Sequence, residues 1–191
     1  MQGVKAGRSV FATPLGFVGL EFGPAGLRRL VLPARSRDAV ARRLLGPRQP
    51  VVAIPEETVG APSFVAGLVV GIRAYMGGDT VDFSDVPLDL EGVDPFRRAI
   101  YAATRQLKLG ETTSYGELAR RAGHPGMARE AGAALGANPV PLVIPCHRVL
   151  AAGGKIGGFS AAGGAVTKQK MLALEGVHVG PPPPAQQAFR F

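Results

Sequence analysis

The only cysteine of the chain, Cys146, stands between Pro145 and the pair His147-Arg148. A thiolate is a strong nucleophile, and a histidine can take the thiol proton near neutral pH. Neighbouring side chains of an extended segment point to opposite faces, so Cys146 and His147 can form a direct hydrogen bond only if the backbone bends at Pro145. Otherwise a bridging water must carry the proton. Such a histidine also needs a third group to fix its tautomer, so we expect a buried carboxylate from elsewhere in the chain. The alternative is a buried structural cysteine, a common fate of a lone cysteine.

The composition limits the classes of protein that the chain can belong to. Its 191 residues suit one large domain or two small ones, and a hydrophobic content of 46% is enough for a packed core, which excludes a disordered chain. One cysteine excludes an internal disulfide and a multi-cysteine zinc site.

The positive charge is concentrated in the second half. From Asp94 onward there are 12 Lys or Arg against 5 Asp or Glu, whereas the residues before it hold 10 against 9. A basic face favours a polyanionic partner, with nucleic acid ahead of an anionic membrane. The alternative is an arginine-rich protein from a high-GC genome, with no such partner.

No targeting signal is visible. The N-terminus lacks a long apolar segment, and the longest apolar stretch, 64–72, holds two glycines and is too short to span a bilayer. We therefore expect a cytoplasmic location, with no membrane partner, which also fits a free thiol.

The first half has the pattern of a small α/β domain without a chemical motif. Strands are predicted at 9–13, 17–22 and 27–32, and a helix from the cap Ser36 to about residue 45. A second helix is predicted at 62–76, because Phe64, Leu68, Ile72 and Tyr75 recur at helical spacing. Residues 86–90 suit either a strand or a linker.

The second half is mainly helical. Asp94 followed by a first-turn proline opens a helix to about residue 107, and Ser114 with Glu117 has the spacing of a capping box for a short helix ending at Gly123. Helices are also predicted at 127–137 and 166–175, and a glycine-rich loop at 156–160. Two short helices across a glycine-containing turn indicate a helix-turn-helix.

The second helix of that pair has an unusual composition. It offers Arg129 followed by small residues, whereas a major-groove reader usually carries several long polar side chains. Small residues let a backbone lie close to a minor groove, and one long cation could fill the gap left by a flipped base. The alternative is that the small residues pack helix on helix and that Arg129 is simply solvated.

Three motifs identify a family. The segments 110–119 (GETTSYGELA), 137–139 (ANP) and 144–149 (IPCHRV) closely resemble methylated-DNA–protein-cysteine methyltransferases. The resemblance covers about residues 94 to 176, with the motifs in family order, and the first half matches only in its coarse pattern. It implies an α/β ribonuclease-like N-terminal domain at 1–92 and a mainly α domain with a winged helix-turn-helix at 93–179. The tail at 180–191 has no core-forming pattern, so we expect it to be disordered.

The resemblance also implies a role for each matched residue. Cys146 accepts the alkyl group, His147 takes the thiol proton through a water, and Glu175 orients His147. Tyr115 protonates the departing guanine and Asn138 braces the active-site turn. The remaining assignments fall into three sets: Arg129, Ser114, Tyr115, Ala131, Gly132 and Ala133 contact DNA; Tyr115, Val149, Phe159 and Ser160 form the substrate pocket; Arg148 is structural.

The implied activity is repair of 6-O-methylguanine in duplex DNA, with 4-O-methylthymine as a further possible substrate. The alkyl group moves irreversibly to Cys146 in a single turnover, after base flipping. We expect a monomer that uses no organic cofactor and no metal. The chain departs from the family pattern at Phe159, where a tyrosine is common, and in a longer loop at 161–164. Cys146 argues against the alkyltransferase-like proteins, which lack the acceptor cysteine.

Two other classes explain part of the sequence. A DNA-binding regulator explains the basic helices but not the pair of Cys146 and His147. A cysteine hydrolase explains the cysteine, histidine and carboxylate but not the helix-turn-helix.

Overall fold

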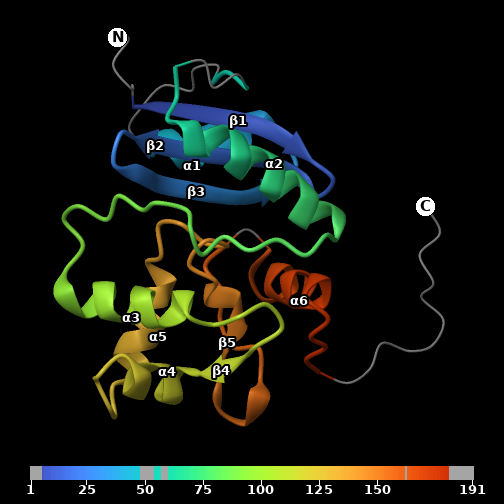
Figure 1. The fold of residues 1–191 in the computed structure, drawn as a ribbon. Helices are drawn as coiled ribbons and strands as arrows, with labels where there is room; N and C mark the ends of the chain where they lie inside the picture. The colour runs from blue at the N-terminus through green and yellow to red at the C-terminus, as the bar shows by residue number, and fades with distance from the viewer. Residues whose placement is uncertain (1–5, 48–53, 57–59, 162, 181–191) are drawn as a thin grey trace, which may run out of the picture.

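A three-stranded antiparallel sheet and two helices form the first half of the fold. The computed structural model describes residues 6–47, 54–56, 60–161 and 163–180. Strands β1 (Gly7–Thr13), β2 (Gly16–Gly23) and β3 (Gly26–Ala34) pair in the order β1-β2-β3. Helices α1 (Arg37–Leu45) and α2 (Ser63–Gly77) follow, so the three strands and two helices predicted from the sequence are confirmed (Figure 1).

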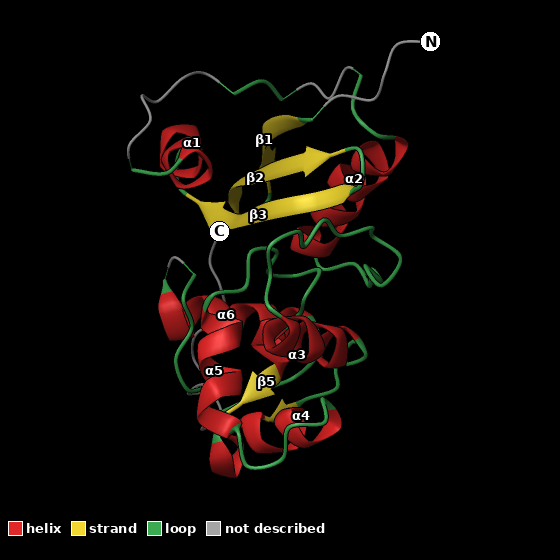
Figure 2. Cartoon of the chain, turned by 90° about the vertical axis from the view of Figure 1, so that its left-hand side faces the viewer, coloured by secondary structure: helices red, strands yellow, loops and turns green. Residues whose placement is uncertain are grey.

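The alternation of side chains along the strands builds a core on each face of the sheet. Val10 and Val31 pack with Val40 of α1, whereas their neighbours Phe11 and Leu30 belong to the larger core that includes α2. The two helices accordingly flank the sheet on opposite sides (Figure 2).

The segment between the halves is a linker attached to the edge of the sheet. Residues 86–90 form no strand apart from an isolated bridge between Leu27 and Leu88. The Leu27 amide donates to the Pro87 carbonyl at 2.8 Å, and the Asp89 amide donates to the Leu27 carbonyl at 3.0 Å. Of the two sequence alternatives for this segment, the linker is the correct one.

The second half is a group of short helices around a two-residue ladder. Helix α3 (Pro95–Arg105) is followed by β4 (Thr113–Ser114), α4 (Tyr115–Arg121) and α5 (Ala128–Gly136). The 3-10 turn η1 (Cys146–Arg148), β5 (Val149–Leu150), the 3-10 turn η2 (Ala152–Gly154) and α6 (Gly164–Leu174) complete it, with β4 and β5 parallel.

The predicted helix caps Ser36, Asp94 and Ser114 are all present, and several helix ends differ from the prediction by one or two residues. Asp94 accepts from the Arg97 amide at 2.9 Å, and Ser114 accepts from the Glu117 amide at 3.1 Å. Helix α3 ends at Arg105, two residues before the predicted end, and α6 begins at Gly164 rather than at residue 166.

The larger core is shared by both halves. It contains Leu20 and Tyr75 from the first half and Ile144 and Met171 from the second. The Leu30 amide of β3 also donates to the Pro139 carbonyl at 2.9 Å, so the sheet edge contacts the connector that leads to Cys146.

Some predictions concern residues outside the described ranges. The expected disordered tail lies there except for Gly180, and Ala162 of the long loop lies there too. Within the described ranges, no helix has the length and apolar character needed to cross a membrane.

Candidate active site

Cys146 directly follows a sharp turn at Pro145. Pro145 has φ −77° and ψ 63°, the conformation of an inverse γ-turn, and the Cys146 amide donates to the Ile144 carbonyl at 2.7 Å. The Arg148 amide then donates to the Pro145 carbonyl at 2.9 Å, which closes the 3-10 turn η1. The backbone therefore bends at Pro145, which is one of the two possibilities that the sequence left open.

Asn138 braces this turn from the end of α5. Its Nδ2 donates to the Ile144 carbonyl at 2.9 Å, and its Oδ1 accepts from the Val140 amide at 3.0 Å. The side-chain amide of Asn138 thereby links the backbone of Val140 to that of Ile144. A hydrogen bond from Asn138 also favours the thiolate form of Cys146.

His147 and Glu175 form a buried pair. The Nε2 atom of His147 lies 2.7 Å from Oε1 of Glu175, and both side chains are fully inaccessible to solvent. A carboxylate can only accept, so Nε2 carries the proton and the neutral ring keeps Nδ1 as a proton acceptor. Nδ1 is buried and has no hydrogen-bond partner among the described residues. The third group expected for a proton-accepting histidine is thus Glu175.

Glu175 is held as a carboxylate by several donors. Arg148 donates from Nε to Oε2 at 2.8 Å and from Nη2 to Oε1 at 3.0 Å, and the Tyr75 hydroxyl donates to Oε1 at 2.8 Å. Burial alone would raise the pKa of Glu175, but hydrogen bonds from His147 and Arg148 outweigh it and lower the pKa to about 2. Arg148 also donates from Nη1 to the Leu107 carbonyl at 2.6 Å, so it links the segment that follows α3 to the pair.

Burial and neighbouring polar or charged groups shift the pKa values of Cys146 and His147 in opposite directions. Burial raises the pKa of Cys146, against the effects of Asn138 and the positive charge of Lys168. Burial also lowers the pKa of His147, against the effect of Glu175, which keeps the ring neutral and able to take a proton. Cys146 therefore needs its neighbours in order to ionise at neutral pH.

Lys168 of α6 is a buried cation beside the thiol. It is fully buried, its Nζ donates to the Val149 carbonyl at 2.5 Å, and it lies 5.7 Å from the centre of the Tyr115 ring. Burial lowers the pKa of Lys168, and the Coulombic effect of Cys146 opposes that shift. Its positive charge thus lies near both the thiol of Cys146 and the ring of Tyr115.

A pocket of about 320 Å³ opens at the sulfur. Its size lies within the range of small-ligand sites. Tyr115 from the start of α4, Cys146 and the loop residues Phe159 and Ser160 line it, together with Gly132 and Gly136 of α5. The pKa of Tyr115 is raised by burial first and then by Cys146, so its phenol stays protonated at neutral pH. The site thus combines a buried thiol, a proton acceptor and a phenolic donor.

The other residues that the sequence assigns to DNA contact lie on α4 and α5 or at the cap of α4. Arg129 is exposed near the start of α5 and has no hydrogen bond or ion pair within the part of the chain that is described. Ala133 is exposed, Gly132 is half-buried, and a Cβ on Gly132 would lie 3.8 Å from the Tyr115 ring. Ser114 is the cap of α4.

Two assignments need correction. Ala131 is 0% exposed and packs in the large core, so its side chain cannot contact DNA. Val149 is also 0% exposed and does not line the pocket; its carbonyl instead accepts from Lys168. In both cases the neighbouring helices cover a small apolar side chain that the sequence alone could not orient.

Sequence reasoning missed Tyr75 and Lys168. Tyr75 was predicted as a core position of its helix, and the partner of its hydroxyl lies 100 positions away. Lys168 did carry a signal, because Leu172 and Glu175 follow it at helical spacing and place it on a buried face. Among the described residues, no group of three or more His, Cys, Asp or Glu side chains is arranged to hold a metal ion.

Known sequences match the chain over most of its length. Residues 95–177 match the family model described as 6-O-methylguanine DNA methyltransferase, DNA binding domain. The chain is 45% identical over 117 residues to a methylated-DNA–protein-cysteine methyltransferase of Mycolicibacterium paratuberculosis, covering 61% of this chain and 68% of that protein. It is 39% identical over 164 residues to a DNA base-flipping protein of Thermus thermophilus, covering 86% of this chain and 96% of that one.

The fold is similar to that of a solved protein–DNA complex. The crystal structure of Mycobacterium tuberculosis OGT in complex with DNA matches with a TM-score of 0.67 and 34% sequence identity. The match covers 88% of this chain and 91% of that chain, so both halves of the fold are included.

Proposed function

Because the chain belongs to the 6-O-methylguanine DNA methyltransferase family, we propose that Cys146 is the residue that accepts the alkyl group. The function of the protein is repair of alkylated DNA by transfer of the alkyl group to the protein, and its partner is duplex DNA. The observation that carries the residue assignment is the buried contact of 2.7 Å between His147 and Glu175, next to the only cysteine.

The proposed first step is ionisation of the thiol. The proton of Cys146 passes through a water to Nδ1 of His147, whose other nitrogen donates to Glu175. Support comes from the tautomer that Glu175 imposes and from the lowered pKa of His147, which keeps the ring neutral beforehand. Asn138 and Lys168 stabilise the thiolate that forms.

The proposed second step is displacement at the alkyl carbon. A sulfur electron pair forms the new carbon–sulfur bond, and the electrons of the carbon–oxygen bond return to the guanine. A proton from Tyr115 keeps the base from leaving as an anion, which would be a poor leaving group. The position of Tyr115 in the pocket at Cys146 and its raised pKa support this role. Phe159 and Ser160 would enclose the base.

DNA binding is assigned to α4 and α5 as a winged helix-turn-helix. Arg129, exposed and without a partner in the described chain, would fill the gap that the flipped nucleotide leaves. Gly132 and Ala133 would let the helix lie close to the backbone of the duplex. We also propose that residues 1–92 form a ribonuclease-like domain and that residues 93–179 form the DNA-binding domain. The protein is proposed to be a cytoplasmic monomer.

Base flipping without transfer is the second candidate. It is favoured by the similarity to the base-flipping protein of Thermus thermophilus, which covers 96% of that protein. Flipping alone requires no nucleophile, however, and this chain places Cys146 beside a buried histidine and carboxylate. We therefore place transfer ahead of flipping alone.

The test is to locate the methyl group after reaction. The full chain and Cys146→Ser are each incubated with a duplex containing one 6-O-methylguanine and are then mapped by peptide mass spectrometry. We expect one methyl group on the peptide with Cys146, none in the serine variant, and DNA binding by both. Binding without any mass gain would indicate flipping alone, and a methyl group on another residue would refute the acceptor assignment.

A further inference from the structure

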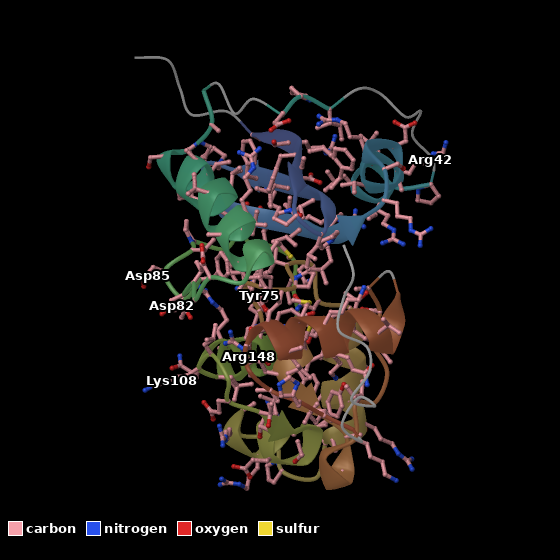
Figure 3. All side chains as sticks on the ribbon, turned by 90° about the vertical axis from the view of Figure 1, so that its right-hand side faces the viewer. Arg42, Tyr75, Asp82, Asp85, Lys108 and Arg148 are labelled. Atoms are coloured by element: carbon pink, nitrogen blue, oxygen red, sulfur yellow. The ribbon has the colours of Figure 1, made fainter. Side chains whose placement is uncertain are left out.

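Tyr75 connects the first half of the chain to the candidate active site. It lies near the end of α2, on the side that faces the second half (Figure 3), and it is 1% exposed. Its hydroxyl donates to Oε1 of Glu175 at 2.8 Å and lies 3.4 Å from the Met171 carbonyl. A core helix of the N-terminal half thus supplies a polar group to a carboxylate of the C-terminal half.

The oxygen that Tyr75 contacts is the one that faces the histidine. Oε1 of Glu175 receives Tyr75, Nε2 of His147 at 2.7 Å and Nη2 of Arg148 at 3.0 Å, whereas Oε2 receives Nε of Arg148 at 2.8 Å. Rotation of the carboxylate would break these contacts together. The hydroxyl of Tyr75 therefore restrains the carboxylate in the orientation that holds His147.

Packing alone does not explain a tyrosine at this position. Its ring fills the large core together with Phe83, whose centroid lies 5.9 Å away in an edge-on arrangement. A phenylalanine would supply the same ring without a polar atom, and a buried hydroxyl is unfavourable unless it is paired. The only side-chain partner of this hydroxyl among the described residues is Glu175.

We propose that Tyr75 is a positioning residue for alkyl transfer, through which the N-terminal half orients Glu175 and sets the basicity of His147. This inference rests on the proposed roles of Cys146, His147 and Glu175. By donating to Oε1, Tyr75 withdraws negative charge from the oxygen that His147 faces. Loss of the hydroxyl leaves that oxygen more negative, stabilises the protonated imidazole and raises the pH at which His147 becomes able to take a proton.

The charged groups around His147 and Tyr75 come from η1, from α6 and from Glu175, the C-terminal cap of α6. His147 faces Glu175, Arg148 and Lys168, and the last two lower its pKa. Tyr75 faces Glu175 and Arg148; burial raises its pKa first and Glu175 raises it further, against Arg148, so the hydroxyl stays a donor throughout the working pH range. None of these groups is removed by substitution of Tyr75.

The test compares Tyr75→Phe with Tyr101→Phe. Tyr101 is equally buried at 1% exposed, and its hydroxyl donates to the Ala134 carbonyl at 2.9 Å, so this control also removes one buried hydroxyl from the same core. Transfer from free 6-O-methylguanine base is measured across pH, because the free base needs no flipping. Mass spectrometry first verifies that the wild type gains a methyl group on Cys146; failure there would refute the proposed function rather than the role of Tyr75.

We expect Tyr75→Phe to move the acid limb of the rate profile upward by about half a pH unit, which is about threefold in rate below the midpoint. Tyr101→Phe is expected to change the melting temperature without moving that midpoint. In a Glu175→Gln background, Tyr75→Phe is expected not to move the midpoint, because Tyr75 acts through the carboxylate. An unchanged midpoint in folded Tyr75→Phe, or an equal shift in Tyr101→Phe, would overturn the proposal.

A second variant keeps the test valid if Tyr75→Phe does not fold. Site-specific replacement of Tyr75 by 3-fluorotyrosine retains the hydroxyl and makes it a stronger donor. The acid limb is then expected to move in the opposite direction, to lower pH. A shift to higher pH, or no shift, would refute the role of the hydroxyl.

Discussion

Replacing Glu175 with glutamine removes the charge of the buried carboxylate while keeping its shape. Glu175 receives donors from Tyr75, His147 and Arg148, and the Arg148 side chain is only 9% exposed. A glutamine offers one acceptor oxygen and directs an NH₂ group toward those donors. Arg148 would then be a buried cation without its counter-ion, a change that typically costs about 3–5 kcal/mol.

The lowered pKa of Glu175 predicts a loss of stability of similar magnitude. Folding lowers it from an ordinary value of 4.5 to about 2. At about 1.4 kcal/mol for each pKa unit, this difference corresponds to about 3 kcal/mol of stability near neutral pH. Because the folded-state pKa is the lower one, the contribution is fully present above pH 4.5 and is lost as the pH falls toward about 2.

The assay is urea unfolding of Glu175→Gln at pH 7, with Glu117→Gln as the matched control. The pKa of Glu117 is also lowered to about 2, by hydrogen bonds from Arg120 and Arg121, but this carboxylate is on the surface. We expect the free energy of unfolding to fall by about 3 kcal/mol for Glu175→Gln and to change little for Glu117→Gln, since water screens the exposed pair. Equal losses in the two variants would refute the argument that burial makes the Glu175 network important.

Three further results are expected. Arg129→Ala slows repair of a duplex more than reaction with the free base, because only the duplex requires flipping at a cost of a few kcal/mol; equal slowing would place Arg129 elsewhere in the mechanism. Lys168→Met raises the pKa of Cys146 and slows transfer from the free base at pH 7 by about three- to tenfold, measured as guanine release, and an unchanged rate would contradict the electrostatic role of Lys168. Affinity for unmodified DNA falls with salt and shows little sequence preference in a selection experiment, because phosphate contacts dominate; a strong preference for one sequence would favour a regulator.

Local features of the fold could be predicted from the sequence. Asp94 and Ser114 cap helices because a cap depends on the next three residues alone, and both caps are present. The bend at Pro145 is equally local. The ladder of β4 and β5 was missed because two residues per strand are too few to show a periodicity.

Features that depend on tertiary packing could not be predicted. The sequence could not say that α5 turns Ala131 inward and Ala133 outward, or that the hydroxyl of Tyr75 meets a carboxylate 100 positions away. Glu175 was assigned only through the family resemblance, since one acidic residue at a helix end has no distinguishing local pattern. Its burial between Arg148 and His147 gives the physical reason for that assignment.

The central claim is that Cys146 accepts one alkyl group and does not release it. Transfer forms a thioether, which water does not readily cleave, and the chain has no second cysteine to take the group. The most direct measurement is a titration of a known amount of protein with excess duplex containing 6-O-methylguanine, followed by counting of the repaired guanines. The expected result is a plateau at one repaired guanine for each chain. A product count that rises steadily beyond this plateau would show turnover and would contradict the account.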